Sequence, residues 1–435
     1  MKHPWLTGPP LIRTMALAAM GLMGGAALLY STTAWAQDSG APEGPVLRIG
    51  VSERLSWSDN PSLSANPTGG RVVSNTRLSF ALTDQTALNT FKLAGNTGLR
   101  LSDSAASGFG SSVADPRFSL AYSRLGATSQ LDLTAAFQRN DIAFLRPLSD
   151  FTDDDGTIDL PTDLDDLQGS GIRQSLKFGA KLTLRDDAPF GLTLSAGVTD
   201  LRYQDVTDPD LNDTTRSFLR ATARLDINDV TQARVGLSYR SFLGSNNRND
   251  SLGLNTGLTI TRPDGELRVS FSADDSDRGT RLRFEAGRSF DLPTGNLSFD
   301  LGLSQSTAGR LKLTGDVSYS HDFDEGQVNA SLRQTITEGS DDSDRLQTSL
   351  SAGLSRPLSP LASLNLGLGY VISENLGSGS STQSADFSAS LGYALSPDWD
   401  LNVGYSFQSR DSDAAEAAHS NSVFVGISRS FEIPL

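Results

Sequence analysis

The most constraining feature of this sequence is a series of long segments in which apolar and polar residues alternate strictly. In 172–184, Leu176 and Phe178 fall on one alternate set and Lys177 and Lys181 fall on the other. Alternation with a period of two places the two sets on opposite faces of a β-strand. Strands of soluble proteins usually have ~5–6 residues, whereas ~9–11 tilted residues cross a bilayer. Segments of this length therefore predict an all-β chain whose strands span a membrane.

The connections between these segments are of two kinds, which alternate along the chain. Tight turns with Asp, Pro or Gly are expected at 83–86, 186–189, 228–230, 262–265, 292–295, 324–326, 357–360 and 396–398. Longer polar connections are expected at 58–70, 140–171, 204–213, 373–381 and 410–419. Short turns at one end and long loops at the other are typical of a transmembrane barrel. We predict a single antiparallel up-and-down β-barrel of about 20 strands, with 18 as the alternative, and both termini in the periplasm.

The N-terminus has the three-part organisation of a secretory signal peptide. Lys2 and Arg13 flank a segment without acidic residues, the apolar stretch 14–30 follows, and Ala34-Trp35-Ala36 fits the small-x-small cleavage rule. The alternative, a membrane anchor, has an apolar stretch near or below the length that spans a bilayer. We therefore expect a signal peptide at 1–36, a short periplasmic segment at 37–45 and the barrel at 46–435.

The composition excludes most kinds of catalytic or cofactor chemistry. The chain has no cysteine, which removes disulfides, thiolate metal sites and cysteine nucleophiles, and only 3 histidines. We expect His321 and His419 at opposite ends of the barrel, where they cannot share a catalytic site. A net charge of −15 disfavours nucleic-acid binding, which depends on phosphate neutralisation. The sequence predicts neither an enzyme nor a cofactor.

The signal peptide, amphipathic strands and loop asymmetry resemble those of a porin-like Gram-negative outer-membrane β-barrel across the whole mature chain. The segment 51–63, VSERLSWSDNPSL, is also similar to uncharacterised barrels encoded near exopolysaccharide-export genes, which often begin with an aromatic-x-Asp-Asn-Pro-like motif. The resemblance implies an outer-membrane location, contact with lipid and lipopolysaccharide, and insertion by the barrel-assembly machinery. The C-terminus departs from the family pattern, because four residues follow Phe431 in place of a terminal aromatic residue.

Basic residues outnumber acidic residues on the polar face of the predicted strands. The candidate pore-lining cations are Arg173, Lys177, Lys181, Arg216, Arg220, Arg224, Arg234, Arg240, Arg281 and Arg283. Charged side chains facing lipid cost ~2–4 kcal/mol near the bilayer midplane, so this face is expected to line the lumen. Cations that line an aqueous pore favour anions over cations. The alternative is that neighbouring acids or an inserted loop neutralise them.

Two acidic features stand apart from the strands. Asp153, Asp154 and Asp155 form a weak calcium candidate in the long loop 140–171, although the spacing of acids does not fit an EF-hand. The pentapeptide Asp-Asp-Ser-Asp-Arg occurs at 274–278 and again at 341–345. Both copies are expected at the same end of the barrel, and chance recurrence in a chain rich in Ser and Asp is the alternative.

The leading functional hypothesis is an outer-membrane channel with a basic lumen, for passive passage of small anionic solutes or export of an acidic polysaccharide. The alternative is a structural or adhesive outer-membrane barrel with a closed lumen and acidic surface loops. A secreted soluble all-β protein is a further alternative, which the long strands disfavour.

Overall fold

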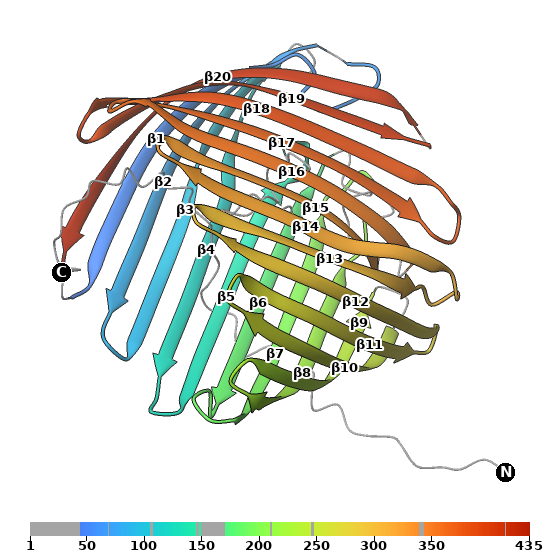
Figure 1. Ribbon diagram of the computed structural model, residues 1–435. Helices are drawn as coiled ribbons and strands as arrows, with labels where there is room; N and C mark the ends of the chain where they lie inside the picture. Colours follow the sequence, from blue (N-terminus) through green and yellow to red (C-terminus); the bar gives the residue numbers. More distant parts are fainter. Residues whose placement is uncertain are drawn as a thin grey trace, which may run out of the picture.

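The computed structural model describes residues 44–67, 69–104, 108–144, 148, 170–208, 211–244, 248–338, 343–413 and 415–435. These residues form one 20-stranded antiparallel sheet that closes on itself (Figure 1). The predicted signal peptide 1–36 and most of the segment 37–45 lie outside the described residues.

The strands are β1 (Val46–Ser58), β2 (Arg71–Gln85), β3 (Asn89–Ser104), β4 (Gly108–Leu125), β5 (Ser129–Asp141), β6 (Ile172–Leu184), β7 (Phe190–Gln204), β8 (Thr214–Asn228), β9 (Thr231–Leu243), β10 (Arg248–Arg262), β11 (Gly265–Ser276), β12 (Gly279–Leu292), β13 (Gly295–Gln305), β14 (Leu311–Phe323), β15 (Gly326–Glu338), β16 (Asp344–Ser359), β17 (Ala362–Asn375), β18 (Ser381–Ser396), β19 (Trp399–Ser412) and β20 (Ala415–Pro434). One short 3-10 helix, η1 (Ile142–Phe144), follows β5. The predicted fold class and the count of 20 strands are confirmed.

The barrel is closed by a ladder between the first and last strands, which lie next to each other in Figure 1. β1 pairs with β20 from Val46 opposite Pro434 to Ser58 opposite Ser422, and it pairs with β2 on its other side. Closure gives every strand two neighbours, so backbone N–H and C=O groups in the ladder are satisfied without water. At the turn end of the barrel, the amide of Leu435 donates to the carbonyl of Pro45 at 2.9 Å.

The connections show the predicted asymmetry between the two ends of the barrel, with local corrections. The loop predicted at 410–419 is wrong, because β19 runs to Ser412 and β20 begins at Ala415. The turns predicted at 83–86 and 357–360 lie slightly further along the chain, since β2 ends at Gln85 and β16 ends at Ser359. Strand pairing continues beyond the apolar zone, so a polar composition marks contact with water rather than the end of a strand.

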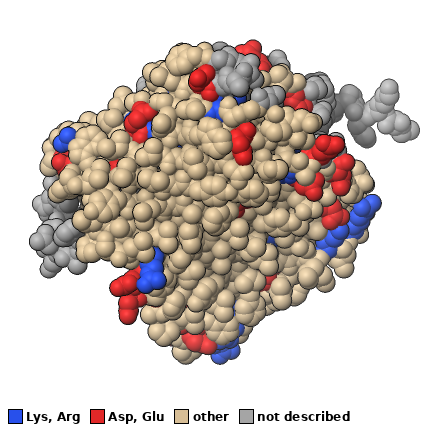
Figure 2. Space-filling view, turned by 90° about the horizontal axis from the view of Figure 1, so that it is seen from above, with Lys and Arg blue, Asp and Glu red and all other residues tan. Residues whose placement is uncertain are grey.

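The alternation seen in the sequence separates an apolar outer face from a polar inner face. Leu219, Leu225 and Leu237 are each at least half exposed on the outside, as expected for side chains that contact lipid. On the face shown in Figure 2, charged side chains lie mainly near the margins, and most of the surface between them carries none. Within the described residues, no helix is long and apolar enough to cross a membrane.

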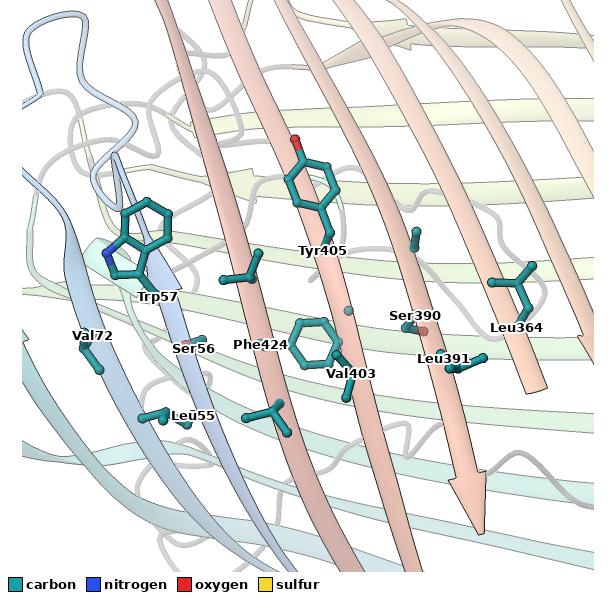
Figure 3. Close-up of a pocket in the computed structure, with 14 residues that line it drawn as sticks. Leu55, Ser56, Trp57, Val72, Leu364, Ser390, Leu391, Val403, Tyr405 and Phe424 are labelled. Atoms are coloured by element: carbon teal, nitrogen blue, oxygen red, sulfur yellow. The ribbon is translucent and has the colours of Figure 1, made fainter. Parts of the chain in front are cut away.

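A shallow apolar groove crosses the outer face where the barrel closes. It has a volume of about 680 Å³, and its lining includes Leu55 and Trp57 of β1, Tyr405 of β19 and Val425 of β20 (Figure 3). The Tyr405 hydroxyl donates to the Oδ1 atom of Asn421 at 2.7 Å, so its polar tip is satisfied at the loop end of the strands. An amphipathic aromatic at this level is typical of the boundary between lipid and water.

The Asp-Asn-Pro motif of the first loop fastens β1 to β20. The Asp59 carboxylate accepts hydrogen bonds from the backbone amide and the side-chain amide of Asn421, both at 2.7 Å. The buried Asn60 donates to the carbonyls of Ser64 and His419 at 2.7 and 2.8 Å. We refer to these contacts as the closing clasp. The motif therefore has a structural role at the loop end of the closing ladder.

Candidate functional site

The predicted pore-lining residues occupy the inner alternate positions of β6, β8, β9 and β12. In β8, for example, Arg220 and Arg224 alternate with the outward-facing Leu219 and Leu225. The ten residues fall into three groups, according to the contacts that each side chain makes.

The first group is a row of cations across β6, β7 and β8. Lys181 is directly opposite Ser195, which is directly opposite Arg220. The same arrangement recurs four residues away on β6, where Lys177 is directly opposite Thr199 of β7. Adjacent strands lie ~4.8 Å apart, so the backbones of Lys181 and Arg220 are about 10 Å apart with a hydroxyl between them.

Three of these cations, Lys177, Lys181 and Arg220, are exposed to the space inside the barrel. In the described part of the chain, no ion pair joins any of the three to a carboxylate. The closest acid in register is Asp132, opposite Lys181 on β5. Its carboxylate instead accepts hydrogen bonds from Ser123 at 2.7 Å and Gln130 at 2.9 Å. We call Lys177, Lys181, Ser195, Thr199 and Arg220 the cationic row.

The second group lines a polar cavity of about 410 Å³ on the inner wall over β8–β12. Arg220, Arg240, Arg281 and Arg283 converge on it from three different strands, together with the hydroxyls of Ser238, Ser270 and Ser272. The cavity and the cationic row share Arg220, so the two form one continuous surface.

Carboxylates neutralise most of the cations in this cavity. Arg240 pairs with Asp274 at 3.0 Å, Arg283 lies 3.8 Å from Glu285, and Arg281 pairs with Asp344. Arg268 outside the cavity is similarly paired with Asp300 at 2.9 Å. Most cations of this cavity are therefore neutralised, whereas those of the cationic row are not.

The third group is held by contacts near the ends of the strands. Arg224 pairs with Asp186 at 2.9 Å and donates to the carbonyl of Ala188 in the β6–β7 turn. Arg234 donates to Gln232 at 2.7 Å.

Two further cations lie nearer the loop end of the barrel. The Arg216 guanidinium lies 5.0 Å from the centre of the Phe242 ring, and Arg173 is buried. The five arginines of the β8–β9 hairpin are therefore divided: Arg216 lies near the loop end, Arg224 and Arg234 lie near the turn, and the other two line the cavity.

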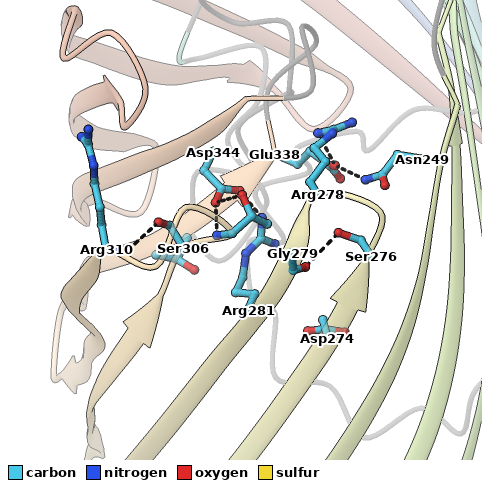
Figure 4. Close-up of polar contacts among 12 residues, drawn as sticks. Asn249, Asp274, Ser276, Arg278, Gly279, Arg281, Ser306, Arg310, Glu338 and Asp344 are labelled. Carbon is cyan, nitrogen blue, oxygen red and sulfur yellow. Dashed lines mark hydrogen bonds and ion pairs between the residues drawn. The ribbon is translucent and has the colours of Figure 1, made fainter.

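An inner layer at the loop end of the barrel was not predicted. Thr335 and Ile336 of β15 lie against this wall: Arg283 donates to the Thr335 hydroxyl at 3.1 Å, and Ile336 lines the cavity at only 3% exposure. Figure 4 shows Asp344 in contact with Arg281, and Glu338 between Arg278 and Asn249.

The repeated pentapeptide was the one sequence signal for this layer. Arg278 belongs to its first copy and Asp344 to its second, and both lie in this cluster (Figure 4). The repeat indicated a shared end of the barrel, but it gave no indication that the last residues of β15 separate from β14.

The calcium candidate Asp153, Asp154 and Asp155 lies outside the described residues. Among the described residues, no group of three or more His, Asp or Glu side chains is arranged to hold a metal ion. His321 and His419 lie on β14 and β20, close to the turn end and the loop end respectively, as predicted.

The comparisons with known proteins concern the fold alone. No family model matches this sequence, and no curated protein matches it. A variant of the ferric enterobactin receptor PfeA from Pseudomonas aeruginosa superposes with a TM-score of 0.51 at 11% identity, covering 90% of this chain and 81% of that one. Another variant of PfeA, in complex with enterobactin, gives a TM-score of 0.51 at 11% identity and covers 90% and 82%.

OccK7 (OpdD) from the same organism is less similar, with a TM-score of 0.40 and 12% identity over 89% of this chain and 99% of that one. The better matches are barrels of the Gram-negative outer membrane. This chain has their fold and an apolar outer face, so the predicted resemblance and the outer-membrane localisation are confirmed.

Proposed function

We propose that this protein is a passive outer-membrane channel that prefers small anionic solutes. The observation that carries the proposal is the cationic row, in which Lys177, Lys181 and Arg220 are exposed inside the barrel and paired with no carboxylate of the described chain. Ser195 and Thr199 lie between the cations and offer hydroxyl donors to the same ligand. Cations and hydroxyls on one wall are the donor set that carboxylates, phosphates and sulfates require.

The magnitude of the effect follows from Coulomb's law. One unit charge ~6 Å from a permeating ion in water contributes about 0.7 kcal/mol, which is roughly a threefold change in local concentration. Lys181 and Arg220 lie on either side of Ser195 and act on the same ion, because the Debye length is about 8 Å at physiological salt; Lys177 lies four residues, or roughly 13 Å, further along β6 and acts on the ion at the next position. The paired arginines of the neighbouring cavity add little to this field, since each lies beside its own counter-charge.

The inner layer of β15 favours small solutes over a polysaccharide chain. Thr335 and Ile336 lie against the inner surface of the wall, and they reduce the width of the lumen at the loop end of the barrel. An acidic polysaccharide would need a wider passage than a small carboxylate or inorganic phosphate.

Planar-bilayer recording on the purified barrel tests the proposal. In a KCl gradient, the reversal potential should show chloride preference, and the preference should weaken as ionic strength rises. Replacing Lys177, Lys181 and Arg220 together with Ser should lower the chloride-to-potassium permeability ratio by about threefold or more.

A matched control replaces a lumenal cation together with its partner. Arg268→Gln with Asp300→Asn removes a 2.9 Å pair but no net charge, so the selectivity should not change. An unchanged chloride-to-potassium permeability ratio in the triple variant would contradict the proposed role of these three cations in anion preference. Absence of any conductance would favour the structural or adhesive barrel.

A further inference from the structure

The ladder between β14 and β15 stops before either strand ends at the loop end of the barrel. Its last pair is Gly315 opposite Gln334, yet β14 begins at Leu311 and β15 runs on to Glu338. The carbonyl of Leu313 receives a hydrogen bond at 2.8 Å from the side-chain amide of Gln334. A side chain therefore satisfies a backbone group at this break in the wall.

Beyond the break, β15 stays paired with β16 and β16 stays paired with β17, while Thr335 and Ile336 lie against the inner face of the neighbouring wall. Ser304 of β13 and Thr314 of β14 occupy inner positions in the wall, are 0% and 2% exposed, and join their hydroxyls in a 2.9 Å hydrogen bond. Thr335 of β15 receives a hydrogen bond from Arg283 of β12, which is three strands away in the sheet. We call Thr335–Glu338 and the paired residues 344–347 the folded-in segment.

The alternation of apolar and polar residues in β15 is that of a wall strand and does not match the place of Thr335–Glu338 in the structure. Ile336 shares its parity with Leu332, which is 45% exposed on the outer face, yet Ile336 is 3% exposed and faces the cavity. If the ladder continued in register, Ile336 would lie opposite Leu313, which is now 60% exposed on the outer face. The sequence of β15 thus fits a wall strand over residues that the structure places inside.

Two carboxylates hold the folded-in segment against the wall. Asp344 pairs with Arg281 and accepts hydrogen bonds from the amide and hydroxyl of Thr307 at 2.6 and 2.8 Å. Glu338 lies 3.4 Å from Arg278 and accepts a hydrogen bond from Asn249 at 3.1 Å (Figure 4). Asp344 is largely buried, so its attraction to Arg281 is only weakly screened.

We propose that the folded-in segment is a gate, and that anions in the lumen open it. In the closed state described here, Asp344 and Glu338 occupy arginines that could otherwise receive an anion. In the open state, Thr335–Glu338 extends the ladder along Leu311–Thr314 and carries with it the ends of β16 and β17 to which it is joined by pairing. Ile336 then moves to the outer face, and Arg281 and Arg283 become accessible. An anion with several negative charges binds the open state better, because its binding site is then free of the protein's own carboxylates, and it shifts the population accordingly.

The two states exchange comparable interactions, which allows both to be populated. Opening releases ion pairs and exposes Ser304 and Thr314, while it adds ladder hydrogen bonds and removes Ile336 from a polar cavity. The gate rests on the proposed function only in the identity of its opening ligand. The conformational change is independent of ion selectivity.

Disulfide trapping tests the conformational change, because the chain has no native cysteine to interfere. In the extended ladder Leu313→Cys and Ile336→Cys would have Cα atoms ~4.5–5.5 Å apart, within the range of a disulfide. In the closed state one residue faces outward and the other faces the lumen. Val317→Cys with Leu332→Cys is a matched control, since these residues are paired already and lie four positions further along each strand.

We expect the control pair to crosslink fully under mild oxidation and the trap pair to crosslink slowly. Adding Asp344→Asn to the trap pair should raise its crosslinking rate about tenfold. Citrate at about 10 mM is the polyanionic probe, and it should raise the crosslinking rate of the trap pair without that substitution. No crosslinking of the trap pair in either condition, with the control pair crosslinked, would refute the gate.

The remaining outcomes separate the gate from the channel proposal. Acceleration by Asp344→Asn but not by citrate would retain a gate and refute opening by anions. Chloride preference in bilayers without trapping would support the channel and refute the gate. Trapping in a barrel without anion preference would refute the channel proposal alone.

Discussion

At the scale of single residues, the closing clasp shows how a loop motif stabilises a barrel. Burial raises the pKa of Asp59, but the hydrogen bonds from the backbone and side chain of Asn421, together with His419, outweigh it and lower the pKa below its ordinary value of 3.8. A lowered pKa in the folded state means that folding stabilises the carboxylate form. The contribution is therefore fully present above pH ~4 and is lost as the pH falls through the folded-state pKa.

This linkage predicts a pH-dependent difference between the protein and its Asp59→Asn variant. The melting temperature in detergent should be higher for the unmodified protein at pH ~6, and the difference should shrink as the pH falls below ~4 and through the folded-state pKa. Hydrogen bonds to a charged group are worth about 1.5–3 kcal/mol, so the difference at pH ~6 should be measurable. A constant difference across this pH range would show that the charge of Asp59 is not involved. Asp264→Asn, at the opposite end of the barrel, controls for general loss of a carboxylate.

Single residues also show what the sequence could and could not predict. A period of two is enough to place Lys177, Lys181 and Arg220 on the inner face. Their freedom from carboxylates depends on the register between strands, which local sequence does not determine. Glu53 shows the same limit, because it shares the outer face with Val51, and its acceptance of a 2.6 Å hydrogen bond from Ser74 follows only from the pairing of β1 with β2.

At the scale of strands, glycines on the inner face allow aromatic rings to lie flat against the wall. A Cβ atom on Gly404 of β19 would come within 2.6 Å of the Phe424 ring and 2.7 Å of the Ala389 carbonyl. The Phe424 ring in turn receives the Arg54 guanidinium, 3.5 Å from its centre. Covering a strand glycine with a cross-strand aromatic ring protects the backbone and fixes the register.

Replacing Gly404 with Val should therefore destabilise the barrel by about 1–3 kcal/mol through steric conflict. Gly257→Val on β10 is the matched control, because its Cβ would meet no atom closer than 3.5 Å. The midpoint of urea unfolding in detergent should fall for the first variant and change little for the second. Equal effects would mean that the loss of glycine itself matters, rather than the ring.

Strand boundaries were predictable wherever the turn chemistry was strong and the alternation was complete. The turns with Asp-Gly or Pro-Thr-Gly lie at or within one residue of their predicted positions. The inward course of Thr335–Glu338 was not predictable, since its alternation continues that of the wall. Long-range contacts to β12 override the local pattern there, and only tertiary structure carries that information.

At the scale of the whole molecule, the acidic chain and its basic cavity are compatible. The net charge of −15 coexists with lumenal arginines because most of them lie beside carboxylates, while the outer face is largely uncharged. Closure and an apolar exterior make the barrel a membrane-spanning body, and the folded ladder should resist detergent at room temperature.

We therefore expect folded protein in the outer-membrane fraction and different gel mobilities for boiled and unboiled samples. The closed ladder should keep the unboiled form compact in detergent, whereas heating should release an extended chain. Recovery of most of the protein in a soluble periplasmic fraction would contradict the membrane-spanning barrel. The unmodified protein and Gly257→Val should behave alike in this assay.

The ladder between β1 and β20 also has a consequence for biogenesis. The first strand to leave the ribosome acquires its second neighbour only when the last strand has been synthesised and exported. An N-terminal fragment of any length retains an open edge with unpaired backbone groups, which other chains can join. The exported polypeptide must therefore be held unfolded in the periplasm until its final residues arrive, and proteases can remove any copy that is cut short of Ala415 before it enters the membrane.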